Sequence, residues 1–424
     1  MLTAIRNSWA LLFGMMLLMI GNGLQGTLLG VRGGAEGMSP AVLGFVMSAY
    51  FIGFLGGTQV TPYLLRRVGH VRVFAALASM ISAAFILYAA VVDPIAWFLM
   101  RIMVGFCLSG VYVVAESWLN DSATNETRGQ TMSAYITAQM LGIISAQALL
   151  NVADPGGYDL FVIMSVLVSI SFAPILLSSS PVPMFESTRR MPLAKLFETS
   201  PLGCVGMCLL GAVFGCLFGM GAVYAADLGM SNVEISIFIG AIYVGGLAFQ
   251  IPIGWASDRM DRRVLIAGVT LVGALASAMA GLASGFVLLT ALAFVIGGMS
   301  NPLYSLLAAY VNDMLEHEDM ASAAGGLILI NGLGALAAPI LVGFVMENIG
   351  PAGFFVVVAT AMGAIFLYAL YRMTQRAATP IDETGPMVAM SPVVSQVATD
   401  AAWEAAMDAE AEAAEQDETP VAAG

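Results

Sequence analysis

Residues 101–121 read RIMVGFCLSGVYVVAESWLND, a run with a charge at its start and near its end and an apolar stretch between them. At about 100° per residue, Arg101, Gly105, Tyr112 and Glu116 fall on one stripe of a helix. A charge inside a bilayer costs roughly 2.5–3.5 kcal/mol even on lenient insertion scales, so it usually faces a protein interior or an aqueous cavity. The stretch therefore predicts a membrane helix with one polar face.

The composition of the whole chain agrees with a membrane protein. It is 59% hydrophobic and 10% charged, whereas soluble proteins carry about 25% charged residues. Ten acids and no base follow Arg376, so the net charge of −13 belongs mostly to the C-terminal end. The composition excludes a soluble protein, and we expect no nucleic-acid partner.

Apolar runs long enough to span a bilayer, about 20 residues each, recur twelve times. A polar interval divides them six and six, which predicts an all-α membrane fold with an N-terminal half (1–180), a linker (181–200) and a C-terminal half (201–376). Residues 377–424 are acidic and rich in Ala, and they predict a solvated tail. The runs lie at roughly 9–30, 41–64, 71–92, 95–118, 129–151, 159–179, 202–226, 233–256, 264–283, 286–311, 322–346 and 352–372.

The basic residues predict the orientation of these runs. With the N-terminus numbered as inside, thirteen Arg and Lys fall in inside segments and only Arg32 falls outside, while Arg101 lies within a run. Inside loops of membrane proteins carry the excess of Lys and Arg. We therefore expect both termini and the linker to be cytoplasmic.

A shift of 192 residues superposes the two halves without a gap. It aligns Gly53 with Gly245, Gly105 with Gly297, and Gly142 with Gly334, and it also pairs Asn120-Asp121 with Asn312-Asp313. Chance matches are common in apolar sequence, but a constant register that includes loop charges indicates a true repeat. Two parallel six-helix halves are an organisation found in secondary transporters, with the substrate site between the halves.

The loop Gly254-Trp-Ala-Ser-Asp258-Arg259-Met-Asp-Arg262-Arg263 resembles the loop signature of the major facilitator superfamily. Its first-half counterpart keeps Arg67, Gly69 and Arg72, but it has Arg66 where the family places Asp. Arg101 with Gly105 resembles the family's Arg and Gly motif in the fourth helix. Asn22-Gly23-Leu-Gln-Gly26, Arg67–Arg72 and Glu116-Ser117-Trp118-Leu119-Asn120 are similar to the YcaD-like branch.

Charges at the inside ends of the helices predict a cytoplasmic gate. Asp258 can accept hydrogen bonds from Arg259 or Arg262, and such a cluster would form in one state of a rocking bundle and separate in the other. The alternative is that these arginines only set topology. The candidate gate residues are Arg67, Gly69, Arg72, Asp121, Gly254, Asp258, Arg259 and Arg263.

Arg101 and Glu116 are the candidate transport and coupling residues. Arg101 could bind an anionic group, pair with a carboxylate that exchanges a proton, or extend to the outer surface; the family resemblance favours coupling. Glu116 is the one acid well within a run, and it could instead be a surface acid near the inside end. Fifteen residues of helix separate the two by about 22 Å, which argues against a direct pair.

Other polar residues within the runs outline an expected substrate cavity. Buried amides often only join helices, but the resemblance implies that the first, fourth, seventh and tenth helices line the cavity. The candidate cavity residues are Asn22, Gln25, Tyr112, Tyr224, Asn301 and Tyr304.

No nucleophile–base–acid set, nucleotide-binding glycine motif or metal-ligand spacing occurs in the chain, so we expect no enzyme, no cofactor and no metal. The prediction is a monomeric, multi-pass transporter of the bacterial plasma membrane that moves a small organic solute by alternating access, with protons as the coupling ion. Alternatives are a uniporter, or a non-transporting sensor or scaffold that acts through its acidic tail.

Overall fold

The computed structural model describes residues 2–122, 125–174, 191–376, 380, 384, 385, 387 and 388. Within these ranges the side chains of residues 2–7, 121–129, 317, 318 and 321 are not described. The tail expected at 377–424 and most of the linker expected at 181–200 therefore lie outside the described residues.

Every regular element in the described part of the chain is helical, as the apolar runs predicted. We call the first six helices the N-terminal bundle: α1 (Leu2–Ala35), α2 (Pro40–Val68), α3 (His70–Ala90), α4 (Pro94–Ser122), α5 (Asn125–Leu149) and α6 (Asp159–Ser171). The short helix α8 (Leu193–Thr199) leads into the C-terminal bundle. This bundle consists of α9 (Pro201–Phe214), the π-helix η1 (Gly215–Met220), α10 (Gly221–Asp227), α11 (Asn232–Ser257), α12 (Arg262–Leu282), α13 (Phe286–Asn312), α14 (His317–Ile349) and α15 (Gly353–Gln375).

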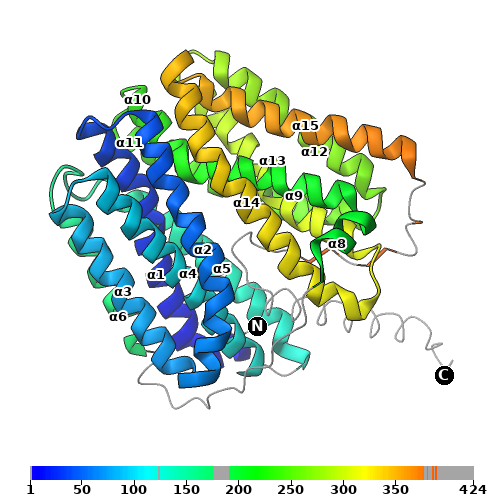
Figure 1. Ribbon diagram of the computed structural model, residues 1–424, viewed down its shortest axis with the longest axis horizontal. Coiled ribbons are helices and arrows are strands. Elements are labelled where there is room, and N and C mark those ends of the chain that lie inside the picture. The colour runs from blue at the N-terminus through cyan, green and yellow to red at the C-terminus, as the bar shows by residue number, and fades with distance from the viewer. Residues whose placement is uncertain are drawn as a thin grey trace, which may run out of the picture.

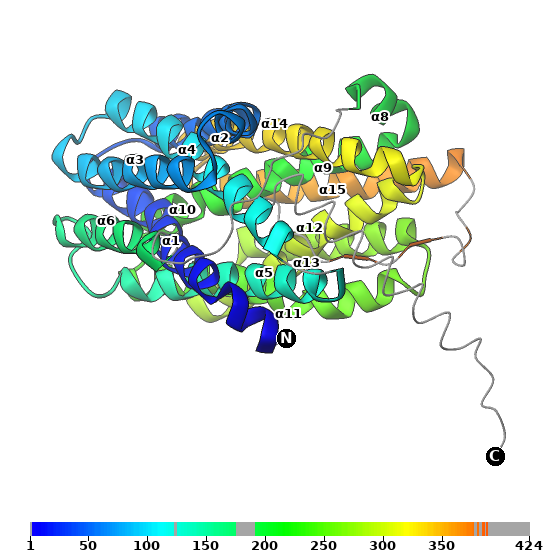
Figure 2. The same ribbon diagram turned by 90° about the horizontal axis from the view of Figure 1, so that it is seen from below.

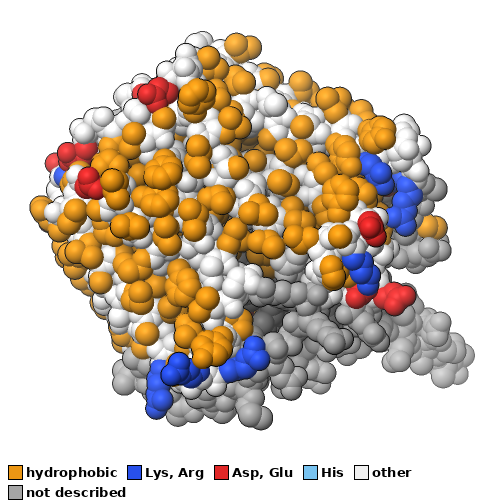
Figure 3. Space-filling view, viewed as in Figure 1, with side chains coloured by type: hydrophobic (Ala, Val, Ile, Leu, Met, Phe, Trp, Pro, Cys, Tyr) orange, Lys and Arg blue, Asp and Glu red, His pale blue; other side chains and the backbone are white. Residues whose placement is uncertain are grey.

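Ten helical segments in the described ranges are long and apolar enough to cross a membrane. Two of the twelve expected runs fall short of that measure. The run at 129–151 forms α5, whose glutamines lower its hydropathy, and the run at 159–179 forms α6, which is 13 residues long and stops before the undescribed residues 175–190. Figure 3 shows hydrophobic side chains over the broad outer face of both bundles, with Lys and Arg gathered at its margins.

The helices of the two bundles pack in the same order. In the N-terminal bundle α1 packs on α5, α2 on α4, and α3 on α6. Their counterparts α9 and α14, α11 and α13, and α12 and α15 repeat these pairs. The pairing agrees with the 192-residue repeat read from the sequence.

Glycines that recur at this interval mark the closest contacts between helix backbones. A Cβ at Gly53 would overlap the Ile102 carbonyl oxygen where α2 crosses α4, and a Cβ at Gly245 would overlap the Phe294 carbonyl oxygen where α11 crosses α13. Small residues allow membrane helices to approach this closely. The matched glycines of the repeat are therefore required by equivalent helix crossings.

The bundles meet where α2 packs on α14, α1 on α10 and α5 on α11, and Figure 2 shows α2 beside α14 and α5 beside α11. Gly44 fits against the Pro339 carbonyl oxygen. Hydrogen bonds cross between the bundles from Ser39 Oγ to Glu347 Oε2 (3.2 Å) and from Asn151 Nδ2 to Ser236 Oγ (2.9 Å). We call this the closed end. The bundles diverge toward the opposite end (Figure 1), which we call the basic end because the α2–α3 and α11–α12 loops place their arginines there.

Candidate functional site

A central cavity lies between the two bundles, and its volume of about 1210 Å³ includes space that is open to solvent. Its walls come from α1, α2, α4 and α5 on one side, and from α9, η1, α10, α11, α13 and α14 on the other. Its polar lining residues are Asn22, Thr27, Tyr50, Arg101, Tyr112, Tyr243, Asn301 and Asn331.

Arg101 projects from α4 into the wall of this cavity. Its side chain is almost fully buried, with the residue only 5% exposed. Nη1 donates a hydrogen bond to Gln25 Oε1 (3.2 Å), the guanidinium carbon lies 5.1 Å from the centre of the Tyr50 ring, and Nε has no hydrogen-bond partner. In this conformation Arg101 does not extend to the outer surface, so that alternative does not hold.

Gln25 lies behind Arg101 rather than on the cavity wall where the sequence analysis expected it. It is fully buried, and its Nε2 donates to the Tyr88 hydroxyl (3.0 Å) while its Oε1 accepts from Arg101. Trp97 Nε1 donates to the carbonyl oxygens of Tyr88 and Val91. This chain of hydrogen bonds ties the guanidinium to α1, α3 and the start of α4, which restricts its orientation.

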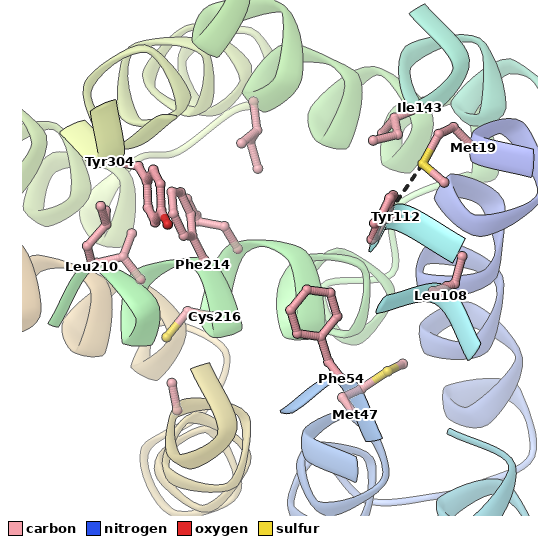
Figure 4. Close-up of a cluster of buried hydrophobic side chains, with 14 of the residues drawn as sticks. Met19, Met47, Phe54, Leu108, Tyr112, Ile143, Leu210, Phe214, Cys216 and Tyr304 are labelled. Atoms are coloured by element: carbon pink, nitrogen blue, oxygen red, sulfur yellow. Dashed lines mark hydrogen bonds between the residues drawn. The ribbon is translucent and has the colours of Figure 1, made fainter. Parts of the chain in front are cut away.

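Seven aromatic residues in the described part of the chain also line the cavity. Phe218 and Tyr243 stack with centroids 4.8 Å apart, and Phe54 lies 6.4 Å from Tyr112. The Tyr112 hydroxyl lies 3.2 Å from Met19 Sδ, a contact drawn in Figure 4. Asn301 and Asn331 each donate an amide hydrogen to a backbone carbonyl of the C-terminal bundle.

The π-helix η1 supplies Leu217, Phe218 and Gly219 to the cavity. This segment is not among the cavity residues expected from the sequence. Its signal was the run of glycines from Gly211 to Gly221, which permits the irregular backbone. Single π-helical turns within α-helices occur frequently at functional sites.

Two tyrosines expected on the cavity wall lie elsewhere. Tyr224 stacks on Phe354 (4.9 Å) and lines a separate hollow toward the closed end. Tyr304 is 4% exposed and does not line the cavity. Both tyrosines were expected on the wall only because the seventh and tenth helices were expected to line the cavity. The rotation of each helix about its axis instead directs their side chains into packing contacts. Asn22, Tyr112 and Asn301 do line the cavity.

Glu116 is fully buried but does not line the central cavity. The Tyr135 hydroxyl of α5 donates a hydrogen bond to its Oε1 (3.0 Å). Glu116 is therefore not a surface acid in this conformation. Glu116 and Arg101 do not contact each other, which agrees with the separation predicted from the helical rise.

The charges at the basic end of the C-terminal bundle centre on Arg262, which the sequence analysis did not place among the gate residues. Its side chain is buried, donates to Asp313 Oδ1 and to Ser257 Oγ (3.0 Å), and lies 3.8 Å from Asp258 Oδ1. The backbone of the chain's far end joins this cluster: Gly385 O accepts from Arg262, and Met387 N donates to Asp258 Oδ1 (2.9 Å).

Burial and ion pairing affect the carboxyls of this end differently. Burial raises the pKa of Asp313, although Arg262 opposes the shift. Burial also disfavours the charge of Asp261, but hydrogen bonds from the Arg263 side chain and backbone outweigh it and hold the pKa of that carboxyl below its usual range. Arg263 pairs with Asp261 at 2.8 Å.

The other gate residues have simpler positions. Arg259 stacks on Trp255 (4.7 Å), and a side chain at Gly254 would meet open space. Gly69 adopts a φ of 81° and ends α2, a conformation that favours glycine. Arg67 at the end of α2 and Arg72 at the start of α3 are exposed on either side of Gly69. The Asp121 side chain lies outside the described residues.

The N-terminal bundle has a weaker counterpart of the Arg262 cluster. The repeat register aligns His70 with Arg262 and Ser117 with Ala309, and His70 Nε2 lies 3.0 Å from Ser117 Oγ. No group of three or more potential metal ligands occurs among the described residues.

Comparisons with known proteins extend over almost the whole chain. The model of the Major Facilitator Superfamily matches residues 11–220 and 202–407. The "Uncharacterized MFS-type transporter YcaD" of Escherichia coli (strain UTI89 / UPEC) is 26% identical over 387 residues, covering 90% of this chain and 98% of the relative.

Two solved structures are similar in fold. A mutant of the nucleoside transporter NupG aligns with a TM-score of 0.77 and 15% identity, over 86% of this chain and 99% of that protein. A bacterial homologue of the human lysosomal transporter Spinster, in an inward-facing and occupied conformation, aligns with a TM-score of 0.72 and 14% identity, over 89% and 97%.

Proposed function

The chain belongs to the major facilitator superfamily, and from this premise we propose that it moves a small organic solute across the membrane by alternating access. The observation that carries the proposal is the central cavity between the two bundles, with a buried cation in its wall and a seal at one end. A cavity open to one side, between bundles that can rock about it, is what alternating access requires.

The proposed topology has twelve membrane helices in two halves, 1–180 and 201–376, joined by a cytoplasmic linker at 181–200. α5 and α6 complete the six of the first half. The excess of Arg and Lys at the basic end supports cytoplasmic termini, and with that orientation the cavity faces inward. The acidic tail, 377–424, would then be cytoplasmic. We propose a monomer in the bacterial plasma membrane.

We further propose that transport is coupled to protons through Glu116. Its burial inside α4 and its hydrogen bond from Tyr135 support this role, because ionisable groups inside membrane proteins mark proton and substrate pathways. Uniport is the second candidate, and it is supported by the absence of Asp and Glu from the described residues that line the cavity.

Flux into proteoliposomes under an imposed pH gradient tests both proposals. We expect concentrative uptake by the parent, loss of uptake in Arg101→Ala, and loss of the response to the gradient in Glu116→Gln. Tyr135→Phe is the matched control, since it removes the hydrogen bond to Glu116 but keeps the carboxyl. Uptake that ignores the gradient in the parent would establish uniport, and coupled flux unchanged in both variants would contradict the assigned roles.

A further inference from the structure

We infer that the central cavity takes a small organic monoanion, a carboxylate carried on an apolar and preferably aromatic body. The inference rests on the proposed transport function, because it names the class of solute for the same cavity. It depends on the charge balance of the cavity wall, the free donor of Arg101 and the distribution of aromatic rings.

The charge balance of the cavity is positive. Arg101 is the only Arg, Lys, Asp, Glu or His among the described residues that line it. The groups nearest to its guanidinium, Gln25 and Tyr50, are neutral, and no described acid forms an ion pair with it. A buried charge without a counter-ion is unfavourable. A ligand carboxylate would supply the missing negative charge.

The guanidinium is also arranged to receive such a group. Gln25 occupies Nη1, while Nε is buried without a partner. Arginine presents its N–H groups in a planar fork that matches the two oxygens of a carboxylate. The hydrogen bond from Gln25 to Tyr88 holds the group that fixes one side of the fork, so the other side, with its unpaired Nε, is oriented before the ligand arrives.

The rest of the wall matches an apolar body rather than a second charge. Phe51, Phe54, Phe214 and Phe218 line the cavity together with aliphatic side chains of η1, α11 and α14. A dianion such as a phosphate ester would need more than one cation for charge balance. A ring can stack between the aromatic faces of the two bundles, and the amides of Asn22 and Asn301 can bind a polar substituent.

A matched series of probes tests the charge requirement with the full-length protein in nanodiscs. Indole-3-acetate, indole-3-acetamide and tryptamine share the indole ring system. They carry a carboxylate, a neutral amide and an ammonium group, respectively. Thermal shift gives an apparent Kd for each probe. We expect the carboxylate to bind at least about tenfold more tightly than either of the other two.

Variants of Arg101 assign the preference to this side chain. Arg101→Gln is expected to remove the preference for the carboxylate, and Arg101→Lys, which keeps the charge but not the fork, is expected to retain part of it. Equal or tighter binding of the amide or the amine would overturn the inference. So would a carboxylate preference that survives in Arg101→Gln, or no shift with the carboxylate at millimolar concentration.

Flux of the same probes separates this inference from the transport proposal. Carboxylate binding without flux would keep the inference and contradict transport. Flux of the amide or the amine in preference to the carboxylate would keep transport and contradict the inference.

Discussion

The N-terminal and C-terminal bundles share one helix order and one set of glycine contacts, but they differ in where they bury charge. In the N-terminal bundle Arg101 and Glu116 are buried within α4. Their register counterparts in α13 are Ala293 and Ala308, which are buried and neutral. The C-terminal bundle instead buries Arg262 with Asp313 at its basic end, where the N-terminal bundle has His70.

This difference indicates a division of roles between two copies of one scaffold. A buried pair with several hydrogen bonds, such as Arg262 and Asp313, is satisfied by the protein itself and serves the structure. Arg101 is a buried cation whose Nε makes no hydrogen bond within the protein, so it can bind a group of the solute. The residues that the repeat does not share are therefore where solute binding and coupling are expected.

The largest effect is expected when the pair in the C-terminal bundle is broken. Asp313→Ala leaves Arg262 buried without its carboxylate, which typically costs about 3–5 kcal/mol, so thermal stability in nanodiscs should fall strongly. Arg262→Leu combined with Asp313→Leu removes both charges and should be less damaging than either single change. If the double variant is the least stable, then Arg262 and Asp313 do not act as a pair that compensates each other's buried charge.

The next largest effect concerns Arg101. Arg101→Gln should lower the transport efficiency kcat/KM about 30- to 150-fold, because a charge-assisted hydrogen bond contributes roughly 2–3 kcal/mol. Thermal stability should change little, since the neighbouring Gln25 and Tyr50 are neutral. Arg66→Gln, which removes an exposed arginine outside the candidate gate and cavity residues, is the control. A loss of flux below threefold would place solute binding elsewhere.

Glu116→Gln should separate coupling from binding. We expect accumulation driven by a pH gradient to fall about tenfold or more, roughly 1.4 kcal/mol, while exchange of solute without a gradient continues. The comparison between the bundles predicts that Ala308→Ser, at the counterpart position, leaves accumulation intact. Loss of both accumulation and exchange in Glu116→Gln would indicate a structural role instead.

Truncation of the C-terminal segment should have a smaller effect, and two deletions of different length can be compared. Deletion of 389–424 keeps Gly385 and Met387, whereas deletion of 377–424 removes their hydrogen bonds to Arg262 and Asp258. We expect only the longer deletion to reduce thermal stability, by about 1 kcal/mol per lost bond, and both to retain flux. If a deletion abolished the protein's effect in cells while solute flux was retained, the result would favour the scaffold alternative.

The smallest effect is expected at Asp261, which is partly exposed and pairs with Arg263. Its folded pKa is below the usual value of 3.8, so its contribution is present above that value and is lost as the pH falls through the folded pKa. Asp261→Asn should lower stability slightly at neutral pH, by roughly 0.5 kcal/mol, and should match the parent under strongly acidic conditions. Unfolding midpoints across pH measure this, and a constant difference would contradict the assignment.

Much of the fold could be predicted from the sequence because membrane insertion depends on local properties. Hydropathy over about 20 residues marks a span, and a fixed interval between glycines marks equivalent helix crossings, as Gly53 and Gly245 show. The sequence also placed Asn22, Arg101, Tyr112 and Asn301 on polar faces, and these line the cavity. The rise per residue of a helix was enough to predict that Arg101 and Glu116 lie too far apart to pair.

Only the tertiary structure determined which groups face one another. Gln25 was expected on the cavity wall but lies behind Arg101 and bonds to it, and Tyr304 is buried away from the wall. Arg262, rather than the neighbouring Arg259 or Arg263, is the centre of the basic-end cluster. A helix's sequence gives the angle between its own side chains, whereas its rotation against other helices is set by backbone contacts between segments far apart in the chain. The chain by itself therefore predicted a membrane protein with two similar halves, and the packing of the bundles decided where Arg101, the one cation among the described residues of the cavity wall, points.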